Sequence, residues 1–180
     1  MEIIETDRLI LRDQIDSDLD DLHRLWSDKK TMYYLEDIIT NTIDESAEHL
    51  KVGIANTDGH YFCICEKATG RIMGCISYTI TETTPLGKIA NMGYMLLPEF
   101  HRHGYMPEAV RSVLEFAFTK DDCIRVTTGC IKSNRASYRV MEKSGFRKEA
   151  EKIKAQYHDG KMKDRLEYAI NKDEFLNNIG

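Results

Sequence analysis

The sequence predicts a mixed α/β domain in which strands and helices interleave along the chain. Short apolar segments, RLILR (8–12) and YFCICE (61–66), predict strands. The spacing i, i+3, i+4, i+7 predicts the buried face of a helix at Val110, Val113, Leu114 and Ala117. The 180 residues contain no repeat, linker or low-complexity segment, so we expect one domain over residues 1–180.

The first half of the chain is predicted to hold two helices and a hairpin. After the strand at 8–12, Ser17 is expected to cap a helix with Leu19, Leu22, Leu25 and Trp26 on one face. The stretch 32–44 has no clear pattern, and a second helix is expected over 45–55. Asp58-Gly59 then turns the chain into the strand at 61–66, and residues 68–70 form the hairpin turn into RIMGCISYTI (71–80).

The second half begins with a loop at 83–87 and a strand that ends at Leu97, closed by Pro98. Pro107 suits the first turn of the next helix, where its missing N–H costs nothing. The strand IRVTTGCI (124–131) precedes a helix over 135–144, with Asn134 as N-cap and Gly145 as C-terminal stop. A hairpin turning at 159–160 and a short tail complete the chain.

The composition is that of a soluble globular protein, with 42% hydrophobic and 31% charged residues. A net charge of −5 argues against a dedicated nucleic-acid binder. The five cysteines form no CxxC pair, and Cys63, Cys65 and Cys75 fit as small apolar strand residues, so we expect a reduced, cytoplasmic protein. The charged N-terminal segment does not resemble a signal peptide, and no stretch approaches the roughly 20 apolar residues of a membrane span.

The segment 93–117, GYMLLPEFHRHGYMPEAVRSVLEFA, predicts an anion site. It combines an apolar strand, a positively charged turn containing Gly104 and the N-terminus of a helix, an arrangement that favours a phosphate-bearing ligand. Gly104 allows close backbone approach and Arg102 supplies permanent charge, although a plain helix-start turn remains the alternative. The glycines of Rossmann and Walker loops are missing, and His101 and His103 lack partners at zinc-ligand spacing, so no metal is expected.

Three segments in the expected order, with a closing hairpin, resemble the GNAT superfamily of N-acetyltransferases, and within it the Rim type that acetylates the N-termini of ribosomal proteins. They are ETDRLILR (5–12), GYMLLPEFHRHGYMPEA (93–109), NRASYRVMEKSGF (134–146) and the hairpin end DRLEYAI (164–170). The resemblance implies a mostly antiparallel, twisted sheet that is splayed at its central strand and flanked by helices. It also implies acetyl-CoA as co-substrate.

The resemblance further assigns residues to acetyl-CoA by position. The family's pyrophosphate loop corresponds to His101, Arg102, His103, Gly104, Tyr105 and Met106. Leu96, with Leu97 beside it, lies where the family's strand splays and pairs with the pantetheine arm, and the Leu96 N–H is expected to donate to the thioester carbonyl. Asn134 begins the second cofactor-contacting helix and also serves as its N-cap. His101 and Met106 depart from the loop's pattern, and Met106 either loosens the grip on the diphosphate or points away from it.

In the reaction that the resemblance implies, a neutral amine attacks the thioester and CoA thiolate leaves. Asn91 stands where many members of the subfamily carry a glutamate, so a direct side-chain base is absent there, and Glu99 or His101 acting through water remain alternatives. Ser137 is the candidate acid for the thiolate, because the more common tyrosine falls at Met141.

The acceptor is expected to be a peptide or protein N-terminus or a small-molecule amine, and the protein a monomer or homodimer. Candidates for an acceptor groove are Tyr33, Tyr34, Tyr94 and Tyr157. The alternative function is a non-catalytic CoA-binding or interaction domain that has kept the fold.

Overall fold

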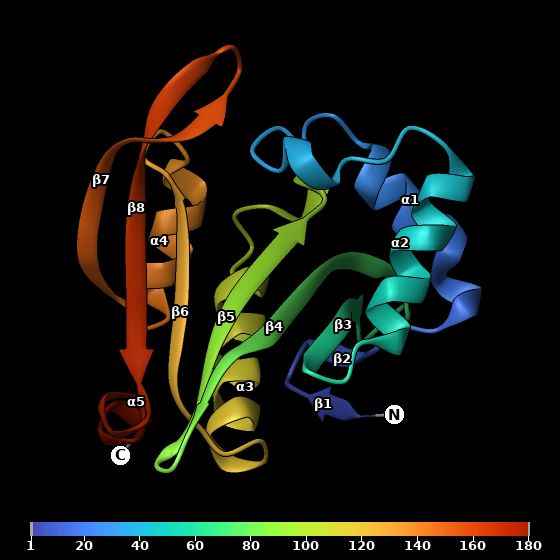
Figure 1. The fold of residues 1–180 in the computed structure, drawn as a ribbon. Coiled ribbons are helices and arrows are strands. Elements are labelled where there is room, and N and C mark those ends of the chain that lie inside the picture. The colour runs from blue at the N-terminus through green and yellow to red at the C-terminus, as the bar shows by residue number, and fades with distance from the viewer. Residues whose placement is uncertain (1, 180) are drawn as a thin grey trace. The chain divides into compact units, whose positions relative to one another are not determined.

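The computed structural model describes residues 2–179, which fold as a sheet with helices. Eight strands of this part of the chain form one sheet in the order β1-β2-β3-β4-β5-β6-β8-β7 (Figure 1). The strands are β1 (Ile3–Glu5), β2 (Leu9–Asp13), β3 (Gly59–Glu66), β4 (Ile72–Thr84), β5 (Gly87–Leu96), β6 (Cys123–Ile131), β7 (Arg147–His158) and β8 (Lys161–Asn171). The helices are α1 (Leu19–Ser27), α2 (Ile43–Ala55), α3 (Tyr105–Thr119), α4 (Arg135–Lys143) and α5 (Lys172–Ile179).

The sheet is mostly antiparallel, as the family resemblance implied. β2 pairs antiparallel with β1 and β3, β3 with β4, and β8 with β6 and β7. β5 and β6 instead pair in parallel, and their register covers only Lys88 to Asn91 of β5. The last five residues of β5 therefore lie outside this register, which matches the predicted splay of the central strand.

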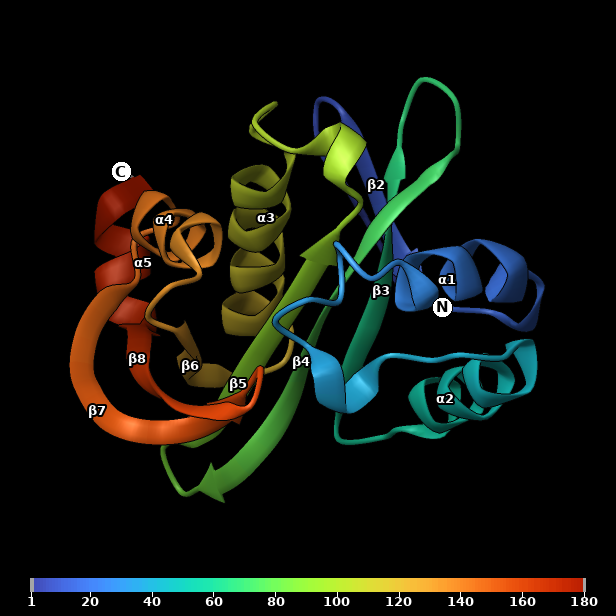
Figure 2. The ribbon, with the colours of Figure 1, turned by 90° about the horizontal axis from the view of Figure 1, so that it is seen from above.

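The chain divides into two compact units, residues 1–79 with 93–109 and residues 80–92 with 110–180. β4, β5 and α3 contribute residues to both. In the first unit α1 and α2 lie side by side (Figure 2). Their apolar faces share one buried cluster with β3 and β4, formed by Leu22, Leu25, Trp26, Met32, Leu50, Cys63, Cys65, Ile72, Cys75 and Leu97.

In the second unit α4, α5 and the later turns of α3 lie on one side of the strands β6, β8 and β7 (Figure 2). The predicted face of α3 is confirmed, because Val110, Val113, Leu114 and Ala117 are fully buried. Phe118 of α3 also packs against Phe175 of α5, with ring centroids 5.3 Å apart. The segment expected to be a short tail is thus a helix, and its aromatic residue completes the core of this unit.

Helix α1 does not begin where the sequence predicted. Ser17 lies within a 3-10 turn, Asp16–Asp18, and α1 starts only at Leu19, so the prediction of Ser17 as N-cap was wrong. The physical reason is Asp18, whose carboxylate accepts two hydrogen bonds from Arg12, each of 2.7 Å, and one from the Ile15 N–H. These bonds hold the chain in a tight turn before the helix begins. The predicted apolar face is nevertheless correct, since Leu22 and Leu25 are fully buried.

Two further boundaries differ from the prediction. α2 begins at Ile43 rather than at 45, because Thr42 and Glu45 form a capping box in which each side chain accepts from the other's backbone N–H. β4 continues to Thr84, so the loop expected at 83–87 is reduced to a turn of Pro85 and Leu86. Elsewhere in the first unit, the hairpin turn at Gly70 is confirmed, with φ of 74°.

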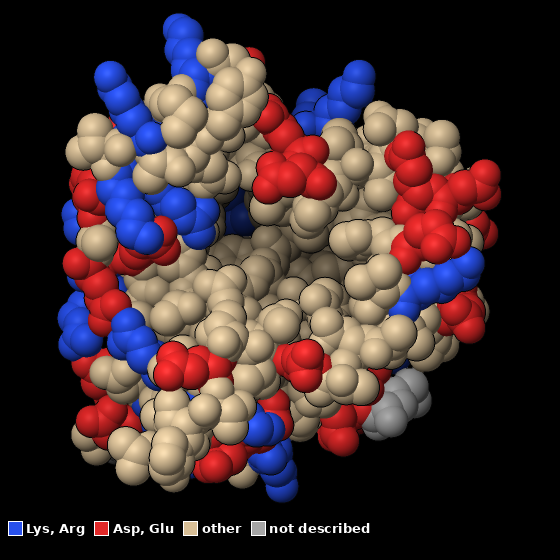
Figure 3. All heavy atoms as spheres, viewed as in Figure 1, with Lys and Arg blue, Asp and Glu red and all other residues tan. Residues whose placement is uncertain are grey.

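The hairpin of β7 and β8 carries many basic side chains, and Lys and Arg gather over it in the upper left of Figure 3. Its predicted turn is confirmed, with Asp159 at φ 49° and Gly160 at φ 72°, the left-handed pair that a two-residue hairpin turn requires. β7 is the last strand in the order of the sheet and therefore an edge strand. Its register with β8 shifts twice, and Lys154, within the second shift, has φ of 49°.

Candidate functional site

The turn between β5 and α3 contains two residues in the left-handed conformation. Arg102 has φ of 67° and Gly104 has φ of 81°. The N–H of Glu108 donates to the Gly104 carbonyl at 3.3 Å, which opens α3. The N–H groups of Tyr105 and Met106 precede that bond, and helix geometry leaves such groups without an acceptor inside the helix. A turn of this kind at a helix N-terminus is suited to an anion, and a diphosphate fits its donor set.

The two residues that depart from the family pattern point elsewhere. The His101 ring lies with Nε2 2.9 Å from the Leu96 carbonyl oxygen, so its ring N–H donates back to the end of β5. The Met106 side chain is only 6% exposed and packs in the core. Met106 therefore does not fill the outer surface of the turn, where residues 101–104 are exposed, and the His101 ring is held by the end of β5.

The end of β5 presents backbone rather than side chains. Leu96 and Leu97 are 8% and 4% exposed. The Leu97 N–H donates to the Met73 carbonyl of β4 at 2.9 Å. This close pairing depends on Gly74, where a Cβ would lie 2.2 Å from the Met95 carbonyl oxygen. Gly74 is a site residue that the sequence analysis missed, and its only signal was a glycine inside a strand pattern.

Arg8 and Tyr105 border a depression beside the turn. It has a volume of about 360 Å³ and is lined by Asp7, Arg8, Glu66, Lys67, Ala68 and Tyr105. Two acidic and two basic residues balance in this lining, so the depression has no net charge of its own to attract an anion. Arg8 lies in the segment 5–12, but no sequence pattern assigned it to the site.

In the second unit, Asn134 and Ser137 lie together at the start of α4. The Asn134 side-chain oxygen accepts from the Ser137 N–H at 3.2 Å, which confirms Asn134 as the N-cap. The Ser137 side chain is half-buried, and its hydroxyl interacts with the thiol of Cys130 on β6. Burial raises the pKa of Cys130, and the contact with Ser137 offsets part of that increase. Cys130 is therefore the neighbour of the candidate acid.

Nearby groups of the same unit are poor alternatives to Ser137 as an acid. Met141, at the position of the usual tyrosine, is 1% exposed and has no proton to donate. Tyr168 on β8 donates its hydroxyl to Glu142 at 3.0 Å. Burial, together with this carboxylate, raises the pKa of Tyr168 to about 12.

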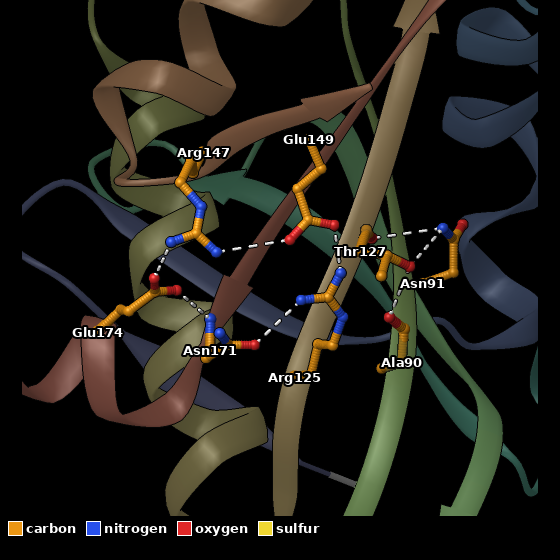
Figure 4. Close-up of polar contacts among 8 residues, drawn as sticks. All are labelled: Ala90, Asn91, Arg125, Thr127, Arg147, Glu149, Asn171 and Glu174. Atoms are coloured by element: carbon orange, nitrogen blue, oxygen red, sulfur yellow. Dashed lines mark hydrogen bonds and ion pairs between the residues drawn. The ribbon is translucent and has the colours of Figure 1, made fainter. Parts of the chain in front are cut away.

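Asn91 lies on the opposite side of this unit's strands from α3 (Figure 4). Its amide nitrogen donates to Thr127 on β6, at 3.1 Å to the hydroxyl and 3.4 Å to the carbonyl, and the Thr127 hydroxyl donates to the Ala90 carbonyl at 3.1 Å. Asn91 is thus a hydrogen-bond donor fixed to the neighbouring strand, and it carries no basic group.

The carboxylate of Glu149, on the same side of the strands, is engaged by arginines (Figure 4). Arg125 and Arg147 both pair with it, and Arg147 also pairs with Glu174. The hydrogen bond from Arg125 lowers the pKa of the Glu149 carboxyl below its usual range. A carboxylate held this way is a weak proton acceptor, so Glu149 does not replace the missing glutamate at Asn91.

The remaining candidates from the sequence have structural partners. Glu99 is exposed and pairs with Arg71 at 2.9 Å. Tyr33 and Tyr34 pack edge to face, with ring centroids 4.8 Å apart. Tyr157 is 66% exposed on β7, in the other unit. Within the first unit the structure therefore joins Leu96, Leu97 and the turn 101–106, and within the second it joins Asn134 and Ser137.

In residues 2–179, no group of three or more His, Cys, Asp or Glu side chains is arranged to hold a metal ion. No helix of that same range is long and apolar enough to cross a membrane.

Comparisons with known proteins identify relatives of this chain. Residues 8–147 match the family model described as an acetyltransferase (GNAT) domain. The curated N-acetyltransferase YoaA of Bacillus subtilis, described as uncharacterized, is 29% identical over 173 residues, which cover 93% of this chain and 96% of YoaA.

Two solved structures show the same fold. One is a spermidine N-acetyltransferase from Vibrio cholerae in complex with CoA and spermine, with a TM-score of 0.84, 19% identity and coverage of 96% of this chain and 100% of that chain. The other is an acetyltransferase from Salmonella typhimurium that modifies the N-terminal serine of ribosomal protein L7/L12. It has a TM-score of 0.81 and 24% identity, and the match covers 94% of this chain and 99% of that chain.

Proposed function

The chain belongs to the GNAT family of acetyltransferases, and from this premise we propose that it transfers the acetyl group of acetyl-CoA to a primary amine by direct attack. The observation that carries the proposal is the turn of Arg102 and Gly104, both left-handed, at the N-terminus of the 15-residue helix α3. Its backbone N–H groups are assigned to the diphosphate of acetyl-CoA. The backbone of Leu96 and Leu97 is assigned to the pantetheine arm, with the Leu96 N–H donating to the thioester carbonyl.

The chemistry needs little from side chains. A neutral amine nitrogen forms a bond to the thioester carbonyl carbon, the C–S bond breaks, and the amine's proton is released as CoA thiolate leaves. Water takes up the amine's proton. We assign the Ser137 hydroxyl to pass a proton from water to this thiolate, and Asn134 to hold the start of α4 that carries Ser137. A thiol with a pKa of about 8.5 is already a good leaving group, so Ser137 assists rather than determines the rate.

The lack of a carboxylate at Asn91 bears on the acceptor. An α-amino group has a pKa of about 8, so a useful fraction is neutral at pH 7, whereas a lysine amine near about 10.4 requires a base. We therefore propose an acceptor whose amine loses its proton easily, a peptide or protein N-terminus or a small-molecule amine of similar pKa. We place the protein in the cytoplasm, since all five cysteines are free and buried, and we expect a monomer or homodimer.

Two measurements on the purified protein test the function. Isothermal titration with acetyl-CoA should show binding at one site per chain. Thiol release should then be followed over a panel of amines. In this panel, each peptide with a free N-terminus is paired with its N-acetylated form, which carries an internal lysine as the amine. We expect the free N-termini or low-pKa small amines to react faster. Absence of acetyl-CoA binding would refute the proposal, and binding without transfer to any amine would favour the non-catalytic alternative.

A further inference from the structure

Arg8 contacts the turn on both sides of Gly104. Its Nη1 donates to the His103 carbonyl at 2.9 Å, before Gly104 in the chain. Its Nε and Nη2 donate to one oxygen of Glu108, at 2.8 and 2.6 Å, in the first turn of α3. The guanidinium also lies over the Tyr105 ring, 4.6 Å from its centroid. A single planar group thus joins the last residue before the glycine to the first residues of the helix.

The segment before β2 completes this arrangement around Glu108. The Thr6 hydroxyl donates to the other carboxylate oxygen at 2.6 Å, and the Arg8 backbone N–H donates to that oxygen at 3.2 Å. Partial burial of Glu108 would raise its pKa, but the hydrogen bonds from Thr6 and Arg8 outweigh this and lower it. Glu108 is therefore ionised, and its side chain is 17% exposed at the helix end that faces the turn.

The carboxylate of Glu108, in the first turn of α3, opposes the binding of an anion there. A diphosphate held by the turn would carry negative charge toward the same helix N-terminus that Glu108 occupies, and like charges repel. Arg8 neutralises the carboxylate while it holds the turn, which contains the left-handed Arg102 and Gly104. Lysine has the same charge but lacks the planar fork that reaches a carbonyl and a carboxylate together.

We propose that Arg8 is a positioning residue for acetyl-CoA: it fixes the diphosphate-binding turn to the segment before β2 and neutralises Glu108. This inference rests on the proposed function, because it assumes that the turn binds the diphosphate. If the proposal holds, Arg8 affects only the binding of the diphosphate part of acetyl-CoA. Loss of Arg8 should weaken binding of CoA and raise the KM for acetyl-CoA, while kcat and the KM for the amine stay unchanged.

The chain offers a matched control in Arg71. Arg71 is 45% exposed at its side chain, against 46% for Arg8, and pairs with Glu99 at 2.9 Å. It also lies over an aromatic ring, 4.9 Å from the centroid of Phe100. Arg71 therefore shares the exposure, the ion pair and the ring contact of Arg8. The hydrogen bond to the His103 carbonyl distinguishes Arg8 from it.

Isothermal titration with CoA is performed on the wild type, R8Q, R8K and R71Q, with thermal melting to check the fold. We expect R8Q to weaken CoA binding about tenfold, as for loss of charge-assisted hydrogen bonds, R8K to fall between R8Q and wild type, and R71Q to match wild type. Acetyl transfer is also measured with S-acetylpantetheine, which lacks the diphosphate. Its kcat/KM should be the same in R8Q and wild type.

The outcomes separate the two proposals. If the wild type fails to bind CoA, the proposed function is refuted and this inference with it. If the wild type binds CoA and R8Q binds it equally well, only the role of Arg8 is refuted. An equal loss with S-acetylpantetheine, or the same loss in R71Q, would refute it as well, because the effect would then be general rather than specific to the diphosphate. Should R8Q fail to fold, R8K provides the same comparison with the charge retained.

Discussion

Gly74→Ala tests how closely β4 and β5 must approach beside Leu96. The new Cβ would lie 2.2 Å from the Met95 carbonyl oxygen and 2.9 Å from the Leu96 Cα. Both are backbone atoms, so no side-chain rotation relieves the overlap. To reach ordinary contact at 3.4 Å, the carbonyl oxygen must retreat by 3.4 − 2.2 = 1.2 Å, and the end of β5 must move with it.

The size of the effect follows from these contacts. Overpacking of this kind costs about 1–3 kcal/mol. Displacing β5 also weakens the bond from the Leu97 N–H to the Met73 carbonyl, and a hydrogen bond contributes about 1 kcal/mol. A total loss of about 2–4 kcal/mol in the free energy of unfolding lowers the melting temperature of a chain of this size by about 5–15 °C. The KM for acetyl-CoA should rise as well, because Leu96 and Leu97 are displaced.

Differential scanning calorimetry measures the change, with Gly93→Ala as the control. Gly93 lies on β5, and a Cβ there would have no atom within 4 Å, so G93A should melt as the wild type does. The comparison keeps the substitution the same and changes only the space around it. If G74A melts within about 2 °C of the wild type, the close approach does not constrain the strand and the reasoning is refuted.

Three further predictions concern single side chains. Asn134→Ala should lower stability to urea by about 1 kcal/mol through loss of the helix cap, and N134D should restore it; equal stability of N134A and wild type would contradict the capping role. Ser137→Ala should lower kcat for thiol release by less than about tenfold, since the leaving thiol has a pKa of about 8.5, and a loss beyond hundredfold would make Ser137 essential. Asp18→Asn should lower the free energy of unfolding by about 3–5 kcal/mol at pH 7, because it leaves the charge of Arg12 without its carboxylate partner. Burial raises the pKa of Asp18, but the bonds from Arg12 and Ile15 outweigh it and the net pKa is lowered, so its contribution is full above pH of about 4 and is lost as pH falls through the folded-state pKa. The difference between D18N and wild type should therefore shrink in acid, and a difference that stays constant to pH 2 would contradict this.

Local signals in the sequence were enough to predict most of the elements. Gly145 and Gly160 adopt positive φ where a helix stop and a hairpin turn were expected, and Pro107 lies in the first turn of α3. Glycine adopts positive φ without strain and proline fixes φ, so these signals depend little on neighbours in space. Asn134 is similar, because its capping bond spans only three residues.

What could not be predicted depends on partners distant in sequence. Arg8 and Glu108 are 100 residues apart, and neither has a pattern that reveals the other. α1 starts later than the sequence predicted, because Arg12, on the preceding strand, holds the carboxylate of Asp18. Gly74 is necessary only because the backbone of Met95 lies against it. The family resemblance supplied the residues proposed to bind the cofactor, whereas the side chains that support them emerged only from the fold.

The irregular β7 has a consequence for how copies of this protein meet in solution. A strand at the end of a sheet exposes backbone groups that another chain can pair with, and flat, apolar edges lead to aggregation. Here Lys152 and Lys154 put charge on that edge, and the left-handed turn at Lys154 bends it out of register. The opposite end of the strand order, β1, is only three residues long. Both borders thus resist continuation of the sheet from molecule to molecule, so the protein should stay dispersed at high concentration, and any homodimer should form through side-chain contacts.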